Sequence, residues 1–316
     1  MDINKEILNL DWKREPYGLY EPIEYTLAAG GKRVRPQLAM IANQLFGGKD
    51  EDVLPAALAL EVFHNFTLLH DDVMDKADVR RGRPTVHVKW NENTAILSGD
   101  QMLIEAYKLL SGVPADKLPK VLQLFNKMAT EICEGQQYDV DFESQEHVTI
   151  DEYLKMIRLK TSVLLANALQ TGAYIADADE QAQEALYQFG INIGLAFQIQ
   201  DDILDVWGDP KTFGKAVGGD ISCNKKTFVY LEAMRLLGDE AKGNELQHWY
   251  SQVLEDNTEK IAAVKEIFEQ SDVRTACEKV VENYTHTALA LLDQLPQNQA
   301  TEQLRKLADK LNTRKN

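Results

Sequence analysis

The sequence contains little cysteine, proline or glycine for its length. Its 316 residues include 3 cysteines, 9 prolines and 18 glycines. Cys133, Cys223 and Cys277 are scattered, and their spacing fits neither a metal site nor a disulfide framework. A reducing cytoplasm is therefore the simplest expected location. No run of about eighteen apolar residues occurs, so no membrane span is expected.

Positive charge is also in deficit. The chain has 34 Lys and Arg against 50 Asp and Glu, a formal net charge of -16. This balance argues against nucleic acid or an anionic membrane surface as a partner. The first residues show no basic region followed by an apolar core, so no secretory signal is expected. An anionic ligand would need a metal ion or local clusters of Lys and Arg.

What the sequence does contain is helical periodicity. Apolar residues make up 44% of the chain and recur at three-and-four spacing almost throughout. Breaks fall at glycine and proline positions, and Thr149-Ile150-Asp151-Glu152 predicts a capping box. We expect one all-α domain over residues 1–316, with helices near 20–29, 34–46, 51–75, 93–111, 116–142, 150–176, 180–207, 225–237, 240–255, 257–269, 272–294 and 298–312.

Two acidic clusters of the form D-D-x-x-D lie 130 residues apart, at 71–75 and 201–205. On a helix, the first and last acids of each cluster share one face. Two unit charges about 4 Å apart repel by about 4 kcal/mol at an effective dielectric of about 20. A solvated acidic face could explain one cluster, but two matched clusters after apolar stretches favour a cation site. Oxygen ligands alone indicate Mg²⁺.

Basic segments accompany the acidic ones. Gly30-Gly31-Lys32-Arg33-Val34-Arg35-Pro36 places cations and glycines at an expected helix start, which suits phosphate binding. Arg80-Arg81-Gly82 follows the first acidic cluster, and Gly214-Lys215 and Asn224-Lys225-Lys226 follow the second. Each segment alone could be a basic surface turn. Together with the acids they suit a diphosphate held through Mg²⁺ and capped by Arg and Lys.

The pattern resembles the trans-type polyprenyl diphosphate synthases, the farnesyl/geranylgeranyl diphosphate synthase family. The resemblance runs from about residue 30 to residue 227 and follows the family's motif order. It is carried by the segments 30–36, His70-Asp71-Asp72-Val73-Met74-Asp75 with Arg80-Arg81-Gly82, Lys160-Thr161, Phe197-Gln198-Ile199-Gln200-Asp201-Asp202-Ile203-Leu204-Asp205, and Gly214-Lys215 with Gly218-Gly219-Asp220. The C-terminal eighty or so residues add no such signature.

The resemblance implies an all-α bundle around a deep central cavity, usually a homodimer, that condenses isopentenyl diphosphate with an allylic diphosphate (dimethylallyl, geranyl or farnesyl). It also implies about three Mg²⁺ ions per active site. The implied metal ligands are Asp71, Asp72, Asp75 and Asp201, with Asp202 and Asp205 as outer or water-mediated partners. The implied allylic-diphosphate residues are Arg80, Lys160, Gln198 and Lys215, and Thr161 is a further implied substrate-binding residue. The implied isopentenyl-diphosphate residues are Gly31, Lys32, Arg35, His64 and Arg81, and Lys225 closes over the site.

Product length and reaction class leave alternatives. In the family, an aromatic at the Phe66 position goes with short products, so geranylgeranyl or farnesyl diphosphate is expected, with Thr67 as the neighbouring chain-length position. An ideal helical wheel, however, turns Phe66 nearly opposite the acids. His64 could be a core histidine, although the wheel places it close to the acids. The rival readings are a terpene cyclase-like lyase and a non-catalytic partner subunit.

Overall fold

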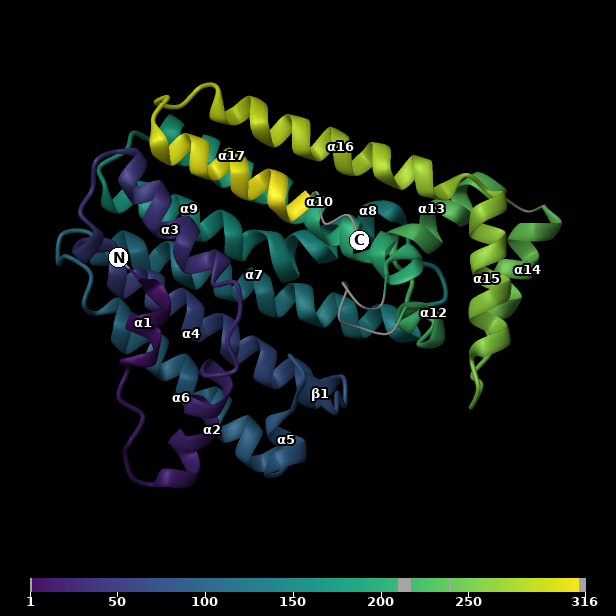
Figure 1. Cartoon of the computed structure of the whole chain (residues 1–316), viewed down its shortest axis with the longest axis horizontal. Coiled ribbons are helices and arrows are strands. Elements are labelled where there is room, and N and C mark those ends of the chain that lie inside the picture. The colour runs from purple at the N-terminus through teal and green to yellow at the C-terminus, as the bar shows by residue number, and fades with distance from the viewer. Residues whose placement is uncertain (1, 210–216, 239, 313–316) are drawn as a thin grey trace. The chain divides into compact units, whose positions relative to one another are not determined.

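The computed structural model describes residues 2–209, 217–238 and 240–312. Helices dominate these residues, and the described strands are the two short ones β1 (Val79–Arg80) and β2 (Arg83–Pro84) (Figure 1). The expected all-α class is confirmed. The chain forms two compact units: residues 1–126, 167–184 and 298–300 make unit 1, and residues 127–166, 185–297 and 301–316 make unit 2. The prediction of a single domain with a central cavity stays a prediction.

Unit 1 is built on one long helix. Its helices are α1 (Ile3–Leu8), α2 (Tyr17–Leu27), α3 (Val34–Leu45), α4 (Asp50–Met74), α5 (Val86–Lys89) and α6 (Glu92–Leu110). Helix α4 packs against both α3 and α6, which Figure 1 shows beside it. Its first turn contains Asp50, Glu51 and Asp52, whose negative charges interact favourably with the positive end of the helix dipole. Its interior positions, such as Val53, Leu60 and Phe63, are buried.

Helix α4 is also long and apolar enough to cross a membrane by length and composition, with a mean hydropathy of 1.3. In the folded chain, 61% of that apolar window is buried inside the protein. Core helices pass the same test, so this helix is weak evidence for a membrane span.

A small antiparallel hairpin follows α4. It pairs Val79 with Pro84 and Arg80 with Arg83. Arg81 and Gly82 form its two-residue turn, and both have a positive φ, 54° and 73°. That geometry is the left-handed one that tight hairpin turns require. The hairpin therefore aims consecutive arginines in different directions.

Unit 2 contains a bent helical segment where the sequence predicted one continuous helix over 150–176. It consists of α8 (Ile150–Ile157), a π-helical turn η1 (Arg158–Ser162) and the start of α9 (Val163–Ile175). The capping box at Thr149 and Glu152 is confirmed. Gly135, on α7 (Leu118–Ser144), lies so close to the π turn that an added Cβ would come within 2.3 Å of the Lys160 backbone nitrogen. Glycine at 135 is what permits this approach.

The other helices of unit 2 include the one that carries the second acidic cluster. They are α10 (Glu180–Trp207), whose first residues belong to unit 1, and α12 (Gly219–Ser222), α13 (Phe228–Leu237), α14 (Ala241–Tyr250), α15 (Thr258–Gln270), α16 (Val273–Leu292) and α17 (Gln299–Asn312). Helix α13 packs on α8, α14 and α16, while α15 packs on α12, α14 and α16. Short helices α1, α5 and α12 were not expected from the sequence, because fewer than two turns show no periodicity.

Candidate active site

The first acidic cluster lies at the C-terminal end of α4. Asp71 is partly buried, Asp72 is 4% exposed, and Asp75 is exposed at the position that ends the helix. Oδ1 of Asp72 accepts a 2.6 Å hydrogen bond from Nε of Arg80 on β1. Burial raises the pKa of Asp72 above its ordinary value, while the charge and hydrogen bond of Arg80 lower it. The charge and hydrogen bond of the hairpin arginine thus oppose the effect of burial on this carboxylate.

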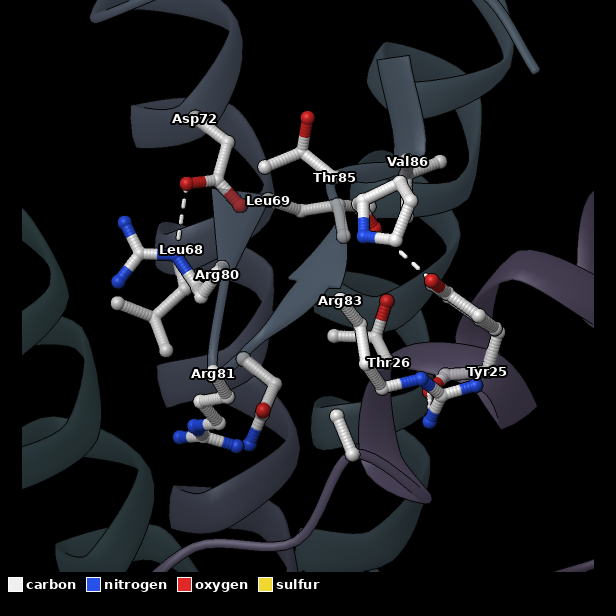
Figure 2. Close-up of a pocket in the computed structure, with 13 residues that line it drawn as sticks. Tyr25, Thr26, Leu68, Leu69, Asp72, Arg80, Arg81, Arg83, Thr85 and Val86 are labelled. Atoms are coloured by element: carbon white, nitrogen blue, oxygen red, sulfur yellow. Dashed lines mark hydrogen bonds and ion pairs between the residues drawn. The ribbon is translucent and has the colours of Figure 1, made fainter. Parts of the chain in front are cut away.

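The three hairpin arginines diverge around a small pocket. Figure 2 shows Arg80 turned to Asp72, Arg81 turned away from it, and Arg83 turned to Tyr25. The Arg83 guanidinium carbon lies 4.0 Å from the centre of the Tyr25 ring, and the Tyr25 hydroxyl donates to the Pro84 carbonyl at 2.9 Å. These contacts tie the hairpin to α2. Arg80 and Arg81 take no part in these contacts: Arg80 bonds Asp72, and Arg81 turns away from it (Figure 2).

Arg81 reaches the glycine turn that precedes α3. Its Nη1 donates a hydrogen bond to the Gly30 carbonyl. Gly31 has a φ of 142°, and an added Cβ there would lie 3.2 Å from the Arg81 guanidinium. Only glycine allows both the backbone conformation and the close approach of this cation. Segments 30–31 and 81, fifty residues apart in the chain, therefore meet.

Arg35 is a further cation of this group, and the uncharged His64 lies beside it. The pKa of Arg35 is lowered to about 10, chiefly by burial; the charge of Glu61 opposes this change and that of Arg81 adds to it. Burial also lowers the pKa of His64 well below its ordinary value, and the charges of Arg35 and Arg81 add to that effect. Among the described residues, no group accepts a hydrogen bond from the buried Nε of Arg35. A cation cluster with an unsatisfied buried donor suits an anionic ligand.

Unit 1 thus brings together Gly31, Arg35, His64 and Arg81, four of the residues predicted from the sequence to bind isopentenyl diphosphate. Lys32 lies in the same turn and is exposed, and its carbonyl accepts from Gln37 at 3.0 Å. His64 is partly buried rather than sealed in the core. The neighbouring His70 contacts the Ile96 carbonyl at 3.1 Å and covers Gly99.

The second acidic cluster, in unit 2, is more deeply enclosed. Asp202 and Asp205 on α10 are buried, whereas Asp201 is partly exposed. Oδ2 of Asp202 accepts from the Tyr153 hydroxyl at 2.6 Å and from the Phe228 backbone N–H at 2.9 Å. Burial raises the pKa of Asp202 well above its ordinary value, and the nearby Asp220 raises it further. This carboxylate is held by protein donors, as an outer partner of a metal would be.

Asp205 holds the segment that follows the acidic cluster. Its Oδ2 accepts from the Asp220 backbone N–H at 3.1 Å, and its own carbonyl accepts from the Gly218 N–H at 2.7 Å. Gly218 has a φ of 85° and begins the short helix α12. Lys225 is exposed after this helix, where its backbone N–H donates to the Asp220 carbonyl at 2.9 Å.

Lys160 sits on the π turn of unit 2. Its Nζ lies 2.6 Å from Oδ2 of Asp139 on α7, and Thr161 beside it is partly buried. Gln198 is partly buried on α10, three residues before Asp201. Lys215 lies outside the described residues. The structure thus gives Lys160 a fixed acidic neighbour, and Gln198 and Asp201 share one helix.

The chain-length position lies among aromatic rings. Phe66 is partly buried, with its ring centre 5.4 Å from that of Phe63 and 4.8 Å from that of His70. Phe63 in turn meets Phe125 at 5.1 Å. Thr67 donates from its hydroxyl to the His64 carbonyl at 2.8 Å. Phe66 therefore belongs to an aromatic face of α4 that the helical wheel separates from the acids.

Sequence reasoning missed several residues that support the site. Tyr153 holds Asp202, Asp139 pairs with Lys160, and the charge of Glu61 acts on Arg35 and Arg81. Tyr153 falls on an inward-facing position, and a buried tyrosine hydroxyl usually has a partner, so its role could have been suspected. Glu61 sits in a long apolar run, where a charged residue needs a partner.

The acidic residues of the two clusters suit Mg²⁺ that is bound partly by the protein and partly by a substrate. Within the described ranges, no group of three or more His, Cys, Asp and Glu side chains forms a closed metal site. Mg²⁺ usually takes one or two carboxylates together with substrate phosphates and waters. Asp71 and Asp75 in unit 1 and Asp201 in unit 2 offer carboxylate oxygens of this type. Within its own unit, each cluster fits a metal that binds together with a diphosphate.

Comparison with known proteins gives a consistent result. Residues 16–270 match the polyprenyl synthetase family. The short chain isoprenyl diphosphate synthase of Methanocaldococcus jannaschii is 43% identical over 252 residues, which are 79% of this chain and 75% of that protein. A crystal structure of a geranylgeranyl pyrophosphate synthase is 47% identical, with a TM-score of 0.92, over 99% of this chain and 96% of that one.

A further crystal structure, of geranylgeranyl pyrophosphate synthase from Corynebacterium glutamicum complexed with isoprenyl diphosphate and magnesium, is 29% identical. Its TM-score is 0.88, and the match covers 99% of this chain and 97% of that one. Family match, sequence identity and fold agree over most of the chain. The chain belongs to the polyprenyl synthetase family.

Proposed function

We propose that this prenyltransferase is a short-chain trans-polyprenyl diphosphate synthase that joins isopentenyl diphosphate to an allylic diphosphate and releases pyrophosphate. One observation carries the proposal: Arg35, His64 and Arg81 converge on the Gly30–Gly31 turn, beside the Arg80–Asp72 pair. A chain with a net charge of -16 has little reason to gather Arg35, Arg80 and Arg81 except to bind an anion.

The proposed substrate residues fall into two groups. Isopentenyl diphosphate would be held by Gly31, Lys32, Arg35, His64 and Arg81. The allylic diphosphate would be held by Arg80, Lys160, Thr161, Gln198 and Lys215, with Lys225 closing over the site. Arginine suits this work because its planar fork can donate two parallel hydrogen bonds to a phosphate.

Mg²⁺ would be bound by Asp71, Asp72, Asp75 and Asp201, with Asp202 and Asp205 as outer partners. The related Corynebacterium enzyme, whose structure contains isoprenyl diphosphate and magnesium, supports this choice. When bound, the metal neutralises negative charge on the departing pyrophosphate. Tyr153 and Arg80 would keep Asp202 and Asp72 in fixed positions for that task.

The reaction then depends on stabilising the charge that develops on the leaving group, and no side chain has to act as a nucleophile. The allylic carbon–oxygen bond breaks and releases pyrophosphate, and the double bond of isopentenyl diphosphate attacks the resulting carbocation. The new carbocation then loses a proton, which the freed pyrophosphate would accept, and the double bond of the product forms. Arg80 and Lys160, each already held by a carboxylate, would stabilise charge on the leaving group without reorganising. Water must be excluded from the cation, which the aromatic face around Phe63 and Phe66 would favour.

We also propose geranylgeranyl or farnesyl diphosphate as the product, a homodimeric state and a cytoplasmic location. The product rests on Phe66, whose ring is braced by Phe63 and His70. A bulky, supported side chain on α4 near the acids could end the space for the growing hydrocarbon.

The decisive experiment supplies purified protein with Mg²⁺, radiolabelled isopentenyl diphosphate and, in separate reactions, dimethylallyl, geranyl and farnesyl diphosphate. Products are sized by chromatography after phosphatase treatment. A synthase yields longer prenyl alcohols only when both substrates are present. Hydrocarbon formed from an allylic diphosphate alone would identify a cyclase, and no product with any primer would leave only the partner-subunit reading.

A further inference from the structure

Arg33 differs from the other cations of its motif because it is turned into the protein. Its side chain is 2% exposed, whereas Lys32 is exposed and Arg35 is partly so. Its backbone has a φ of 47° and a ψ of 41°, directly before α3. A left-handed conformation is uncommon and strained for a residue with a Cβ, and it persists only where the surroundings hold it.

The Arg33 guanidinium uses all three nitrogens to hold that conformation. Nη1 lies 2.7 Å from Oε1 of Glu61 on α4, and Nη2 donates to the Leu27 carbonyl at the end of α2 at 2.5 Å. Nε donates to Oδ1 of Asn4 on α1 at 3.3 Å. One side chain therefore fixes the loop between α2 and α3 against three helices of unit 1.

Glu61, the acidic partner of Arg33, is also buried and hydrogen-bonded. Its side chain is 3% exposed, and Asn65 Nδ2 donates to its Oε1 at 3.1 Å and to its backbone carbonyl at 2.8 Å. Its charge also acts on Arg35 and Arg81. Glu61 is thus a buried acid beside the cations of the diphosphate site, and it accepts hydrogen bonds from Arg33 and Asn65.

We infer that Arg33 and Glu61 are positioning residues for isopentenyl diphosphate: their buried pair fixes the left-handed turn that directs Lys32 and Arg35 to the substrate. The inference rests on the proposed function. Arg33 lies between the two residues that would bind the diphosphate, so a shift of its backbone moves both. Lysine cannot replace it, because an ammonium group lacks the planar fork that reaches three acceptors.

A purely structural pair would behave differently. Replacing a buried ion pair with apolar residues of similar volume often leaves stability unchanged or improves it. The double variant Arg33→Met/Glu61→Met therefore separates folding from positioning. It removes the buried charges together, but it also removes the hydrogen bonds to Leu27 and Asn4 that hold the turn.

The test measures three quantities for wild type, for Arg33→Lys and for Arg33→Met/Glu61→Met. They are the thermal midpoint, the KM for each of the two substrates, and the Kd for isopentenyl diphosphate by calorimetry in EDTA. A matched control is Arg14→Met/Glu105→Met, which removes another ion pair of unit 1, joined at 3.0 Å. The control is expected to keep the wild-type KM values.

We expect both Arg33 variants to raise the KM and the Kd for isopentenyl diphosphate at least tenfold. The KM for the allylic substrate should stay within about threefold of wild type, and the double variant should keep a near-normal thermal midpoint. A folded double variant with an unchanged Kd, or with both KM values raised equally, would overturn the inference. Failure of the wild type itself to consume isopentenyl diphosphate would instead overturn the proposed function.

Discussion

Tyr153 donates a 2.6 Å hydrogen bond to Oδ2 of Asp202, the middle acid of the second cluster. The Phe228 N–H supplies the same oxygen with a second bond, so α8, α10 and α13 meet at one carboxylate. This arrangement fixes Asp202 from behind. The neighbouring Asp201 is partly exposed, whereas Asp202 is enclosed by these donors.

Tyr153→Phe should therefore weaken both folding and metal use. Loss of one donor to a buried carboxylate costs about 1–3 kcal/mol of unfolding free energy, which urea denaturation can measure. The Mg²⁺ concentration for half-maximal activity should rise, because Asp201 sits beside a less constrained carboxylate. Tyr107→Phe is the control, since that exposed hydroxyl bonds Asn126 at the same 2.6 Å. Equal effects in the two variants would contradict the role of Tyr153.

The first acidic cluster should separate catalysis from stability. Asp71→Ala removes a proposed metal ligand that is partly exposed, so turnover should fall about 100-fold to 1,000-fold with little change in the unfolding midpoint. Asp72→Ala should lower the unfolding free energy as well, because it leaves Arg80 without its buried partner. Steady-state kinetics at saturating Mg²⁺ and urea denaturation distinguish the two. Near-normal turnover of Asp71→Ala would count against the metal assignment.

Phe66→Ala should lengthen the product. The substitution opens space on the aromatic face of α4 between Phe63 and His70, so the hydrocarbon can grow past this point. Chromatography of the dephosphorylated products reports the change directly. Phe66→Tyr keeps the ring and should keep the wild-type distribution. The same product length from Phe66→Ala and wild type would exclude Phe66 as the limit.

His64 should make the protein less stable in mild acid. Its folded pKa lies well below the ordinary value because of burial and the nearby Arg35 and Arg81. The unfolded chain takes up a proton near pH 6.5, and the folded one does not, so the stabilisation present above pH 6.5 declines as the pH falls. His64 alone can change the free energy of unfolding by at most about 1.4 kcal/mol per pH unit.

Urea unfolding of the metal-free protein between pH 7.5 and 5.5 tests this expectation. His64→Gln should show a shallower loss of stability toward acid than wild type. His147→Gln, which changes an exposed imidazole, should follow the wild-type profile. Parallel profiles for wild type and His64→Gln would show that this histidine takes up its proton equally in both states.

Gly135→Ala should disturb the turn that carries Lys160. The new methyl group would lie 2.3 Å from the Lys160 nitrogen and 2.8 Å from the Leu159 carbonyl carbon, so the backbone must move. We expect a loss of roughly 1–3 kcal/mol in unfolding free energy and a lower turnover number. Gly18→Ala is the control, because an added Cβ there meets nothing within 4 Å. Unchanged kinetics for Gly135→Ala would show that the turn tolerates displacement.

Long amphipathic helices were predictable from the sequence. The helix expected over 34–46 is Val34–Leu45, and that expected over 180–207 is Glu180–Trp207, because many turns repeat the same apolar spacing. The start of α8 was equally clear, since Thr149 and Glu152 carry their own hydrogen-bonding chemistry. The grouping of Arg35, His64 and Arg81 came from a family resemblance, and the structure supplies its geometry.

Other features depend on contacts that a pattern does not contain. The left-handed Arg33 is set by acceptors on three separate helices, which no local sequence signal announces. The pairing of Lys160 with Asp139 joins residues 21 positions apart across two helical segments. The change from α to π hydrogen bonding at 158–162 leaves the apolar spacing almost continuous, so it was read as one helix.

The π turn also affects how the chain tolerates a change in length. A wide turn holds one more residue than the α-helical turn that would replace it. Deleting one residue between 158 and 162 would let the segment relax to an uninterrupted α-helix, and the residues before and after it would keep their faces, because the wide turn already absorbs the extra residue. Fully buried Ala166 and Leu169 would then stay in the core. A single deletion in this segment should therefore spare the core and change mainly the position of Lys160.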